Sequence, residues 1–229
     1  MDDILKKRAE KAYMILAAIF LSALVASNLI FQKFFQWSPF GLYTFELSVG
    51  ILPYPITFIV TDLVSEIYGR RRANQMVFVG FVASLFTLLI VVVADSASAT
   101  SWSPISDQTF SEVFGFTYVA VGASMVAYLL AQLVDVQLFH FWKKVTKGKH
   151  LWLRNNASTF TSQLVDTLVI LLILCSLDVI AWERFTGLLI NGFLFKVLIA
   201  MADTPLVYLV VGIFRHQFKL KTNQEIIDF

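Results

Sequence analysis

The sequence predicts an all-α, polytopic membrane protein whose single domain is a bundle of six transmembrane helices. Hydrophobic residues make up 58% of the 229 residues and charged residues only 15%, whereas soluble domains carry about 25% charged residues. The mean hydropathy is +0.73. The apolar residues gather into six runs long enough to cross a bilayer. We expect these spans at about 13–31, 44–68, 74–94, 116–141, 156–179 and 188–213.

The distribution of positive charge predicts the orientation of the bundle. Fifteen of the 18 Lys and Arg residues lie in the N-terminal segment, the second-to-third loop, the fourth-to-fifth loop and the tail. The opposite side holds only Lys33 and Arg184, and Lys196 lies within the last span. Because cytoplasmic loops are enriched in Lys and Arg, both termini are predicted to be cytoplasmic.

The first span, at 13–31, carries a stripe of small residues and a polar end. Ala18, Ser22 and Ala26 recur every four residues, which permits close approach of another helix. Asn28 follows near the end of the run. No small-residue cleavage site follows this run, so we interpret it as a span rather than a cleaved signal.

The second span, at 44–68, contains two prolines near its middle, Pro53 and Pro55. Proline lacks the backbone donor of a helix and clashes with the preceding turn, so the helix should break or kink here. A broken helix at mid-membrane exposes backbone groups that bind substrates in transporters, and a simple kink is the alternative. Asp62 and Glu66 follow in the second half of the span.

The fourth and fifth spans carry regular polar faces, whereas the third looks like apolar scaffold. Gln132 and Asp135 stand three residues apart in the fourth span. In the fifth span, polar residues at steps of three, four and three follow one helical face. They are Asn156, Thr159, Gln163 and Asp166.

The tetrapeptide Gln-Leu-Val-Asp occurs twice, at 132–135 and at 163–166. A carboxylate within an apolar span costs roughly 2.5–3.5 kcal/mol on insertion scales, so it normally faces protein or water. Two such groups on consecutive antiparallel spans predict one polar chamber between them. Hydrogen bonding that only joins the helices is the alternative.

The sixth span, at 188–213, contains Lys196 and, seven residues later, Asp203. A lone ammonium in a membrane interior would lose its proton or destabilise the fold, so we expect Lys196 to pair with a carboxylate. The alternative is that its long side chain reaches the membrane surface.

A pocket lined by Asp, Gln and Asn suits a flat, polar heterocycle. A carboxylate accepts hydrogen bonds from a ring N–H and an adjacent amine, and an amide side chain both donates and accepts. Tyr54, Tyr128 and Phe160 could stack on such a ring. This chemistry alone does not distinguish a purine from an amino acid or an amine.

Several other functions find no support in the sequence. No phosphate-binding G-x-x-x-x-G-K-[ST] segment is present, so the chain is not predicted to be its own ATPase. No hydrolase or metalloprotease motif is present either, and we expect no enzyme activity, cofactor or metal. The single cysteine, Cys175, lies in an apolar run and is expected to be a small buried hydrophobe.

Four segments together resemble the queuosine-precursor transporter family, a branch of the vitamin-uptake transporters. They are TDLVSEIYG at 61–69, AYLLAQLVDV at 127–136, NAST at 156–159 with Asp166-Thr167, and FKVLI at 195–199. The resemblance implies a bacterial inner-membrane protein that takes up 7-deazaguanine bases (preQ0, preQ1 or queuine) for salvage into modified tRNA. The resemblance implies that the polar motif positions of the family, which are its candidate substrate-binding residues, correspond here to Asn28, Asp62, Gln132, Asp135, Gln163, Asp166 and Lys196. Asn156 is a further candidate substrate-binding residue.

The energy source and the partners stay open at this point. The chain could act without other proteins as a secondary carrier or facilitator, either as a monomer or as a homo-oligomer in the bilayer. Alternatively, it could be the substrate-binding subunit of an energy-coupling-factor importer for another vitamin-like molecule, docked on a separate ATPase module through Ala18, Ser22 and Ala26. A structural membrane protein without cargo is a third class. No nucleic-acid partner is expected.

Overall fold

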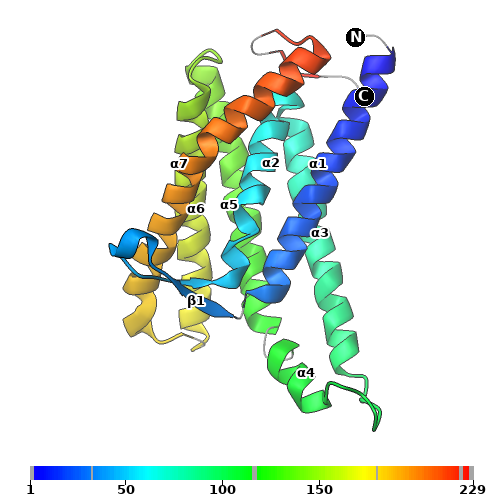
Figure 1. Ribbon diagram of the computed structural model, residues 1–229, viewed down its shortest axis with the longest axis vertical. Coiled ribbons are helices and arrows are strands. Elements are labelled where there is room, and N and C mark those ends of the chain that lie inside the picture. Colours follow the sequence, from blue (N-terminus) through cyan, green and yellow to red (C-terminus); the bar gives the residue numbers. More distant parts are fainter. Residues whose placement is uncertain (1–2, 32, 115–117, 179, 222–223, 227–229) are drawn as a thin grey trace.

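Six long helices run alternately up and down the molecule, as the computed structural model in Figure 1 shows. The structure describes all residues except 1–2, 32, 115–117, 179, 222–223 and 227–229. Each of the six helices is long and apolar enough to cross a membrane, which confirms the predicted fold class. They are α1 (Asp3–Ile30), α2 (Tyr54–Ile67), α3 (Gly69–Asp95), α5 (Tyr118–Val145), α6 (Leu151–Ser176) and α7 (Phe185–Phe218). The second span reaches membrane length over Val49–Ile67, where α2 continues the turn that precedes it.

The two ends of the bundle differ. The start of α1 and the end of α7 lie at one end, which we call the termini end (Figure 1). The opposite end, called the hairpin end, carries a two-stranded hairpin, the short helix α4 (Asp107–Phe114) and the 3-10 turn η4 (Trp182–Arg184). The segment between the third and fourth predicted spans, at 95–115, therefore contains a helix of its own.

The hairpin occupies part of the segment expected to be loop and membrane helix. Strands β1 (Phe34–Trp37) and β2 (Phe45–Ser48) pair antiparallel, with η1 (Pro39–Gly41) between them and η2 (Val49–Ile51) after them. Phe45 and Leu47 are buried against Phe195 of α7, and Trp37 packs edge-on to the same ring. These aromatic contacts fix the hairpin against the hairpin end of the bundle.

The prolines lie at the start of α2 and do not interrupt it. Pro53 is the cap residue before Tyr54, and Pro55 falls in the first turn. Proline is tolerated there because the first N–H groups of a helix have no partner within the helix. The expected break therefore lies between η2 and α2. At this junction α2 begins with Tyr54, whose side chain enters the polar interior of the bundle.

A continuous apolar core joins α1, α2, α3, α5 and α7. Phe20 and Leu24 of α1 are fully buried against it. A Cβ atom at Gly80 of α3 would stand 2.6 Å from the Phe20 ring, so glycine permits this close helix contact. Ala18, Ser22 and Ala26, which were expected to allow such a contact, are exposed on the opposite face of α1.

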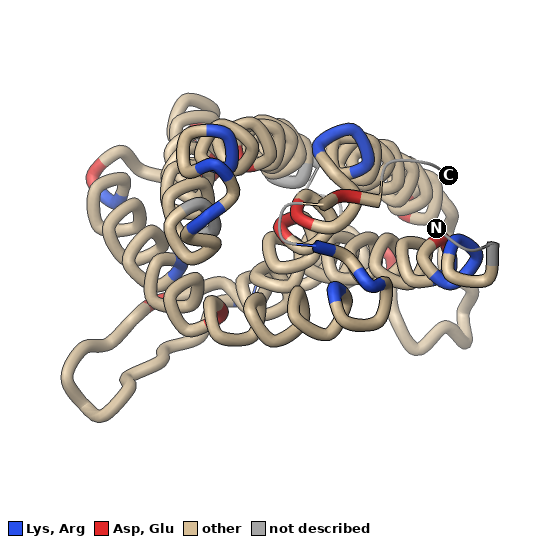
Figure 2. Tube along the Cα trace, turned by 90° about the horizontal axis from the view of Figure 1, so that it is seen from above, with Lys and Arg blue, Asp and Glu red and all other residues tan. Residues whose placement is uncertain are grey.

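Ion pairs close the core at the termini end. Glu66 of α2 is fully buried and pairs with Arg215 of α7 and with Lys143 of α5, whose Nζ lies 3.6 Å from Oε2. Lys143 also bonds Glu225, at 2.7 Å. Figure 2, viewed along the helices, shows Lys and Arg at several helix ends. A buried carboxylate is tolerated here because two cations satisfy it.

We therefore expect Glu66→Gln to destabilise the protein by on the order of 3 kcal/mol, since it leaves two cations without their shared carboxylate. The melting temperature of the purified protein measures this effect. Glu183→Gln, at an exposed carboxylate of the hairpin end, is the control and should leave the melting temperature unchanged. A melting temperature of Glu66→Gln equal to that of the control would show that the network contributes little.

Candidate functional site

An ion pair between α6 and α7 lies in the interior of the bundle. Lys196 Nζ is 2.5 Å from Asp166 Oδ2 and donates to Thr167 Oγ1 at 3.1 Å. Both charged side chains are about nine-tenths buried. Lys196 therefore pairs with a carboxylate, as expected, and does not extend to the membrane surface.

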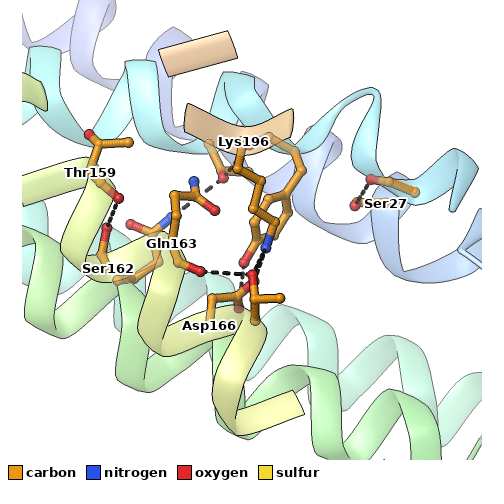
Figure 3. Close-up of polar contacts among 11 residues, drawn as sticks. Ser27, Thr159, Ser162, Gln163, Asp166 and Lys196 are labelled. Carbon is orange, nitrogen blue, oxygen red and sulfur yellow. Dashed lines mark hydrogen bonds and ion pairs between the residues drawn. The ribbon is translucent and has the colours of Figure 1, made fainter. Parts of the chain in front are cut away.

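Tyr54 of α2 completes this group. Its hydroxyl donates to Asp166 Oδ1 at 2.8 Å, and Lys196 Nζ lies 5.1 Å from the centre of its ring. The start of α2 at the η2 junction places the ring between α6 and α7. We call Tyr54, Asp166 and Lys196 the floor cluster; Figure 3 labels Asp166 and Lys196 and shows their contact.

A cavity of about 220 Å³ opens above the floor cluster toward the hairpin end. Its walls come from the end of α1, the hairpin, α5, α6 and the start of α7. Besides the floor cluster, its polar lining includes Asn28, Glu46, Ser124 and Tyr128. The Tyr128 hydroxyl is buried and has no hydrogen-bond partner among the described residues, so it is free to bind a ligand. The volume admits a small ring system and far exceeds that of a single water.

A second polar layer lies deeper, between α2, α5 and α6. The carboxyl groups of Asp62 and Asp135 are within hydrogen-bonding range of each other. Ser162 donates to Asp135 Oδ1 at 2.9 Å. Gln132 donates to Thr57 at 3.4 Å. All of these side chains are buried.

A narrow pocket of about 20 Å³ joins the two layers. Asp62, Thr159 and Gln163 line it from one side, and Asp203 of α7 lines it as well. Lys196 lines both this pocket and the larger cavity. The floor cluster thus lies between a cavity that is open toward the hairpin end and this narrow pocket.

The two Gln-Leu-Val-Asp segments do not meet in one chamber, contrary to expectation. Asp166 lines the cavity, whereas Asp135 is fully buried beside Asp62. The four letters agree, but Asp135 meets Asp62 of α2 and Ser162 of α6, whereas Asp166 meets Tyr54 of α2 and Lys196 of α7. Gln132 likewise bonds α2, while Gln163 faces the narrow pocket.

The two predicted asparagines differ in position. Asn28 lines the cavity, and its Nδ2 is 3.5 Å from Ser84 of α3. Asn156 bonds Thr204 of α7 at 2.8 Å and lines neither the cavity nor the narrow pocket. The side chain of Asn156 therefore joins α6 to α7. Phe160 lines neither pocket.

Two contributors to the site escaped prediction. The hydroxyl of Tyr54, expected only as a stacking ring, bonds the paired carboxylate. Ser162 holds Asp135, although the spacing of Ser158 and Ser162 by four residues marks one helix face and could have indicated it. The hairpin, which forms one wall of the cavity, was harder to predict from the sequence, because its short strands continue into an apolar run.

Six membrane-length helices around a charged, partly open interior define a membrane protein with a polar small-molecule cavity. Residues 48–210 match the family described as "Putative vitamin uptake transporter", so the chain belongs to the vitamin uptake transporter family. This is a transporter family and not a class of enzymes.

Two relatives are similar over most of the chain. The "Queuosine precursor transporter" of Escherichia coli (strain K12) is 28% identical over 196 residues, covering 83% of this chain and 82% of the relative. The "Probable queuosine precursor transporter" of Bacillus subtilis (strain 168) is 27% identical over 168 residues, covering 73% and 72%. No solved structure matches the chain.

Proposed function

We propose that the chain takes up 7-deazaguanine precursors of queuosine (preQ0, preQ1 or queuine) across the bacterial inner membrane. The family and the names of the relatives support this substrate class. The cavity supports it chemically, since it combines a carboxylate, an ammonium, an amide and two tyrosine rings. In this proposal the hairpin end faces the exterior and the termini end faces the cytoplasm.

The floor cluster is the observation on which the proposal depends. Asp166 accepts hydrogen bonds from the ring N–H and the amine of the base, and Lys196 donates to its ring carbonyl. The rings of Tyr54 and Tyr128 pack edge to face, 6.3 Å apart at 67°, and together form one aromatic wall against the base. Binding of the base then competes with the contact between Lys196 and Asp166, so an occupied cavity loosens the barrier to the deeper pocket.

Uptake is tested in a bacterial strain that depends on salvage, by measuring queuosine in tRNA after feeding one precursor at a time. Expression of this chain should restore queuosine with at least one of the three precursors. The vector alone is the control. Absence of queuosine with all three precursors, at normal membrane levels of the protein, would refute the proposed substrate class.

The proposed orientation makes a separate prediction about topology. Reporter fusions after Phe31, within 95–115 and within 178–187 should report the exterior, whereas fusions at both termini should report the cytoplasm. The physical reason is the concentration of Lys and Arg at the termini end. A cytoplasmic signal from 95–115 would contradict the orientation.

A further inference from the structure

Asp62 of α2 and Asp135 of α5 form a pair of carboxyl groups in the middle of the bundle. Their residues are 2% and 0% exposed, and the two groups lie within hydrogen-bonding range. We call them the carboxyl pair. Two carboxylates so close, away from water, repel each other strongly. The packing seen here therefore requires a positive charge at or near the pair.

The cations of the surrounding helices are engaged elsewhere. Lys196 pairs with Asp166 on the side of the cavity. Arg215 and Lys143 pair with Glu66 at the termini end. In the described part of the chain, no Lys, Arg or His forms an ion pair with the carboxyl pair.

The other charged groups that face the pair are acidic. Glu66 lies one turn further along α2, and Asp203 of α7 lines the narrow pocket together with Asp62. The side of α6 contributes hydroxyl and amide groups, which carry no charge. Apart from Lys196, which is paired with Asp166, the protein itself therefore supplies negative charge and dipoles here.

Gln163 Oε1, on the side of α6, is buried and lacks a hydrogen-bond partner within the described ranges of the chain. Asp62 Oδ1, Asp135 Oδ2 and Thr159 Oγ1 are buried as well, and Asp62 has Asp135 and Thr159 as its hydrogen-bonding neighbours, neither of which is a cation. Unsatisfied buried oxygens are costly and call for an explanation. Asp62, Thr159 and Gln163 also line the narrow pocket, whose volume of about 20 Å³ holds one water or one small ion.

We propose that the carboxyl pair binds one monovalent cation, a proton or Na⁺, and that the entry of this cation drives uptake of the substrate. Oxygen ligands suit both ions, since a proton can be shared by the carboxyls and Na⁺ can bind the buried oxygens. Among the described residues no cluster of three or more His, Cys, Asp or Glu side chains could hold a metal ion, which argues against a divalent site. The inference rests on the proposed function, because uptake is the process that the cation drives.

The connection to substrate passes through Lys196. This side chain pairs with Asp166 at the cavity floor and also lines the narrow pocket beside Asp62. A cation at the carboxyl pair repels the Lys196 ammonium from the narrow pocket toward the cavity, where it donates to the carbonyl of the base. Cation binding and substrate binding therefore favour each other, as transport of both in one direction requires.

The test uses the purified protein in proteoliposomes with labelled preQ1 or queuine as the substrate. Exchange of external for internal substrate is measured without ion gradients, and net accumulation is measured with an inward proton gradient, an inward Na⁺ gradient or neither. Wild-type protein should accumulate roughly tenfold more substrate with one of the gradients. Asp62→Asn and Asp135→Asn should lose this stimulation and keep exchange, whereas Asp95→Asn at the end of α3 should keep both.

Two results would overturn the cation site. One is wild-type accumulation that responds to neither gradient, including accumulation that requires ATP and an added ATPase module. The other is gradient-driven accumulation by both Asn variants at the wild-type level. Absence of exchange by the wild type would instead refute the proposed substrate.

A measurement without substrate keeps the two proposals separate. The melting temperature of the wild type should rise with acidification if the ligand is a proton, or with NaCl but not choline chloride if it is Na⁺. Binding of the cation relieves repulsion in the folded state only, so it stabilises that state. Asp62→Asn and Asp135→Asn should flatten the response. A wild-type melting temperature that responds to neither ion, or equally in the variants, would refute the site.

Discussion

Replacing Lys196 by alanine should lower uptake of the queuosine precursor by roughly a hundredfold or more. Truncating one member of a buried charge pair costs about 2–5 kcal/mol, and about 1.4 kcal/mol corresponds to a factor of ten. The variant leaves Asp166 as a carboxylate with only the Tyr54 hydroxyl and without the cation 2.5 Å away. It also removes the proposed donor to the carbonyl of the base.

The measurement is precursor-dependent queuosine in tRNA, divided by the amount of protein in the membrane. Lys196→Arg should retain part of the uptake because it preserves the charge, although the planar guanidinium fits the Thr167 contact poorly. Lys33→Ala, at an exposed lysine near the hairpin, is the matched control and should be neutral. Full uptake by Lys196→Ala at normal membrane levels would show that the pair has no role in transport.

The double variant Lys196→Gln with Asp166→Asn separates binding from folding. It removes both charges together, so the cost of an unpaired buried charge disappears and membrane levels should recover. Uptake should stay low, because the substrate loses both its acceptor and its cationic donor. Recovery of uptake would mean that the pair serves the fold alone.

The sequence contained the polar faces of the helices but not the way in which they meet. A period of 3.6 residues places Gln163 and Asp166 on one face of α6, and this arrangement is found. It says nothing of how α6 is rotated against α5 and α7. That rotation, set by packing of all six helices, makes Asp166 the partner of Lys196 and leaves Asp135 beside Asp62.

The hairpin shows a second limit. Phe45 and Leu47 alternate with polar residues, which is a strand pattern, but the segment continues into the apolar start of α2. Apolar length alone therefore favours one long span over a strand followed by a helix. The decisive contact, Phe45 against Phe195, joins positions 150 residues apart and has no local signal.

Replacing Asp166 by asparagine should lower uptake, divided by the amount of protein in the membrane, by roughly ten- to a hundredfold. The amide keeps the shape of the carboxylate but presents a donor where the base presents its own N–H groups, at about 1–3 kcal/mol for each group left unpaired. Tyr54 can still donate to the remaining oxygen, which preserves the local packing. Asp95→Asn, at the end of α3 in the hairpin end of the bundle, is the control and should leave uptake unchanged.

An analogue of the precursor without the exocyclic amine identifies the group that Asp166 contacts. In the wild-type protein this analogue should bind roughly tenfold more weakly than the precursor, because one hydrogen bond to the carboxylate is lost. In Asp166→Asn the precursor and the analogue should bind about equally, since the amine no longer has its acceptor. Calorimetry on the purified proteins measures all four affinities and so the coupling between the side chain and the amine. If Asp166→Asn weakens both ligands by the same factor, the carboxylate does not contact the amine, and its effect on uptake comes through Lys196.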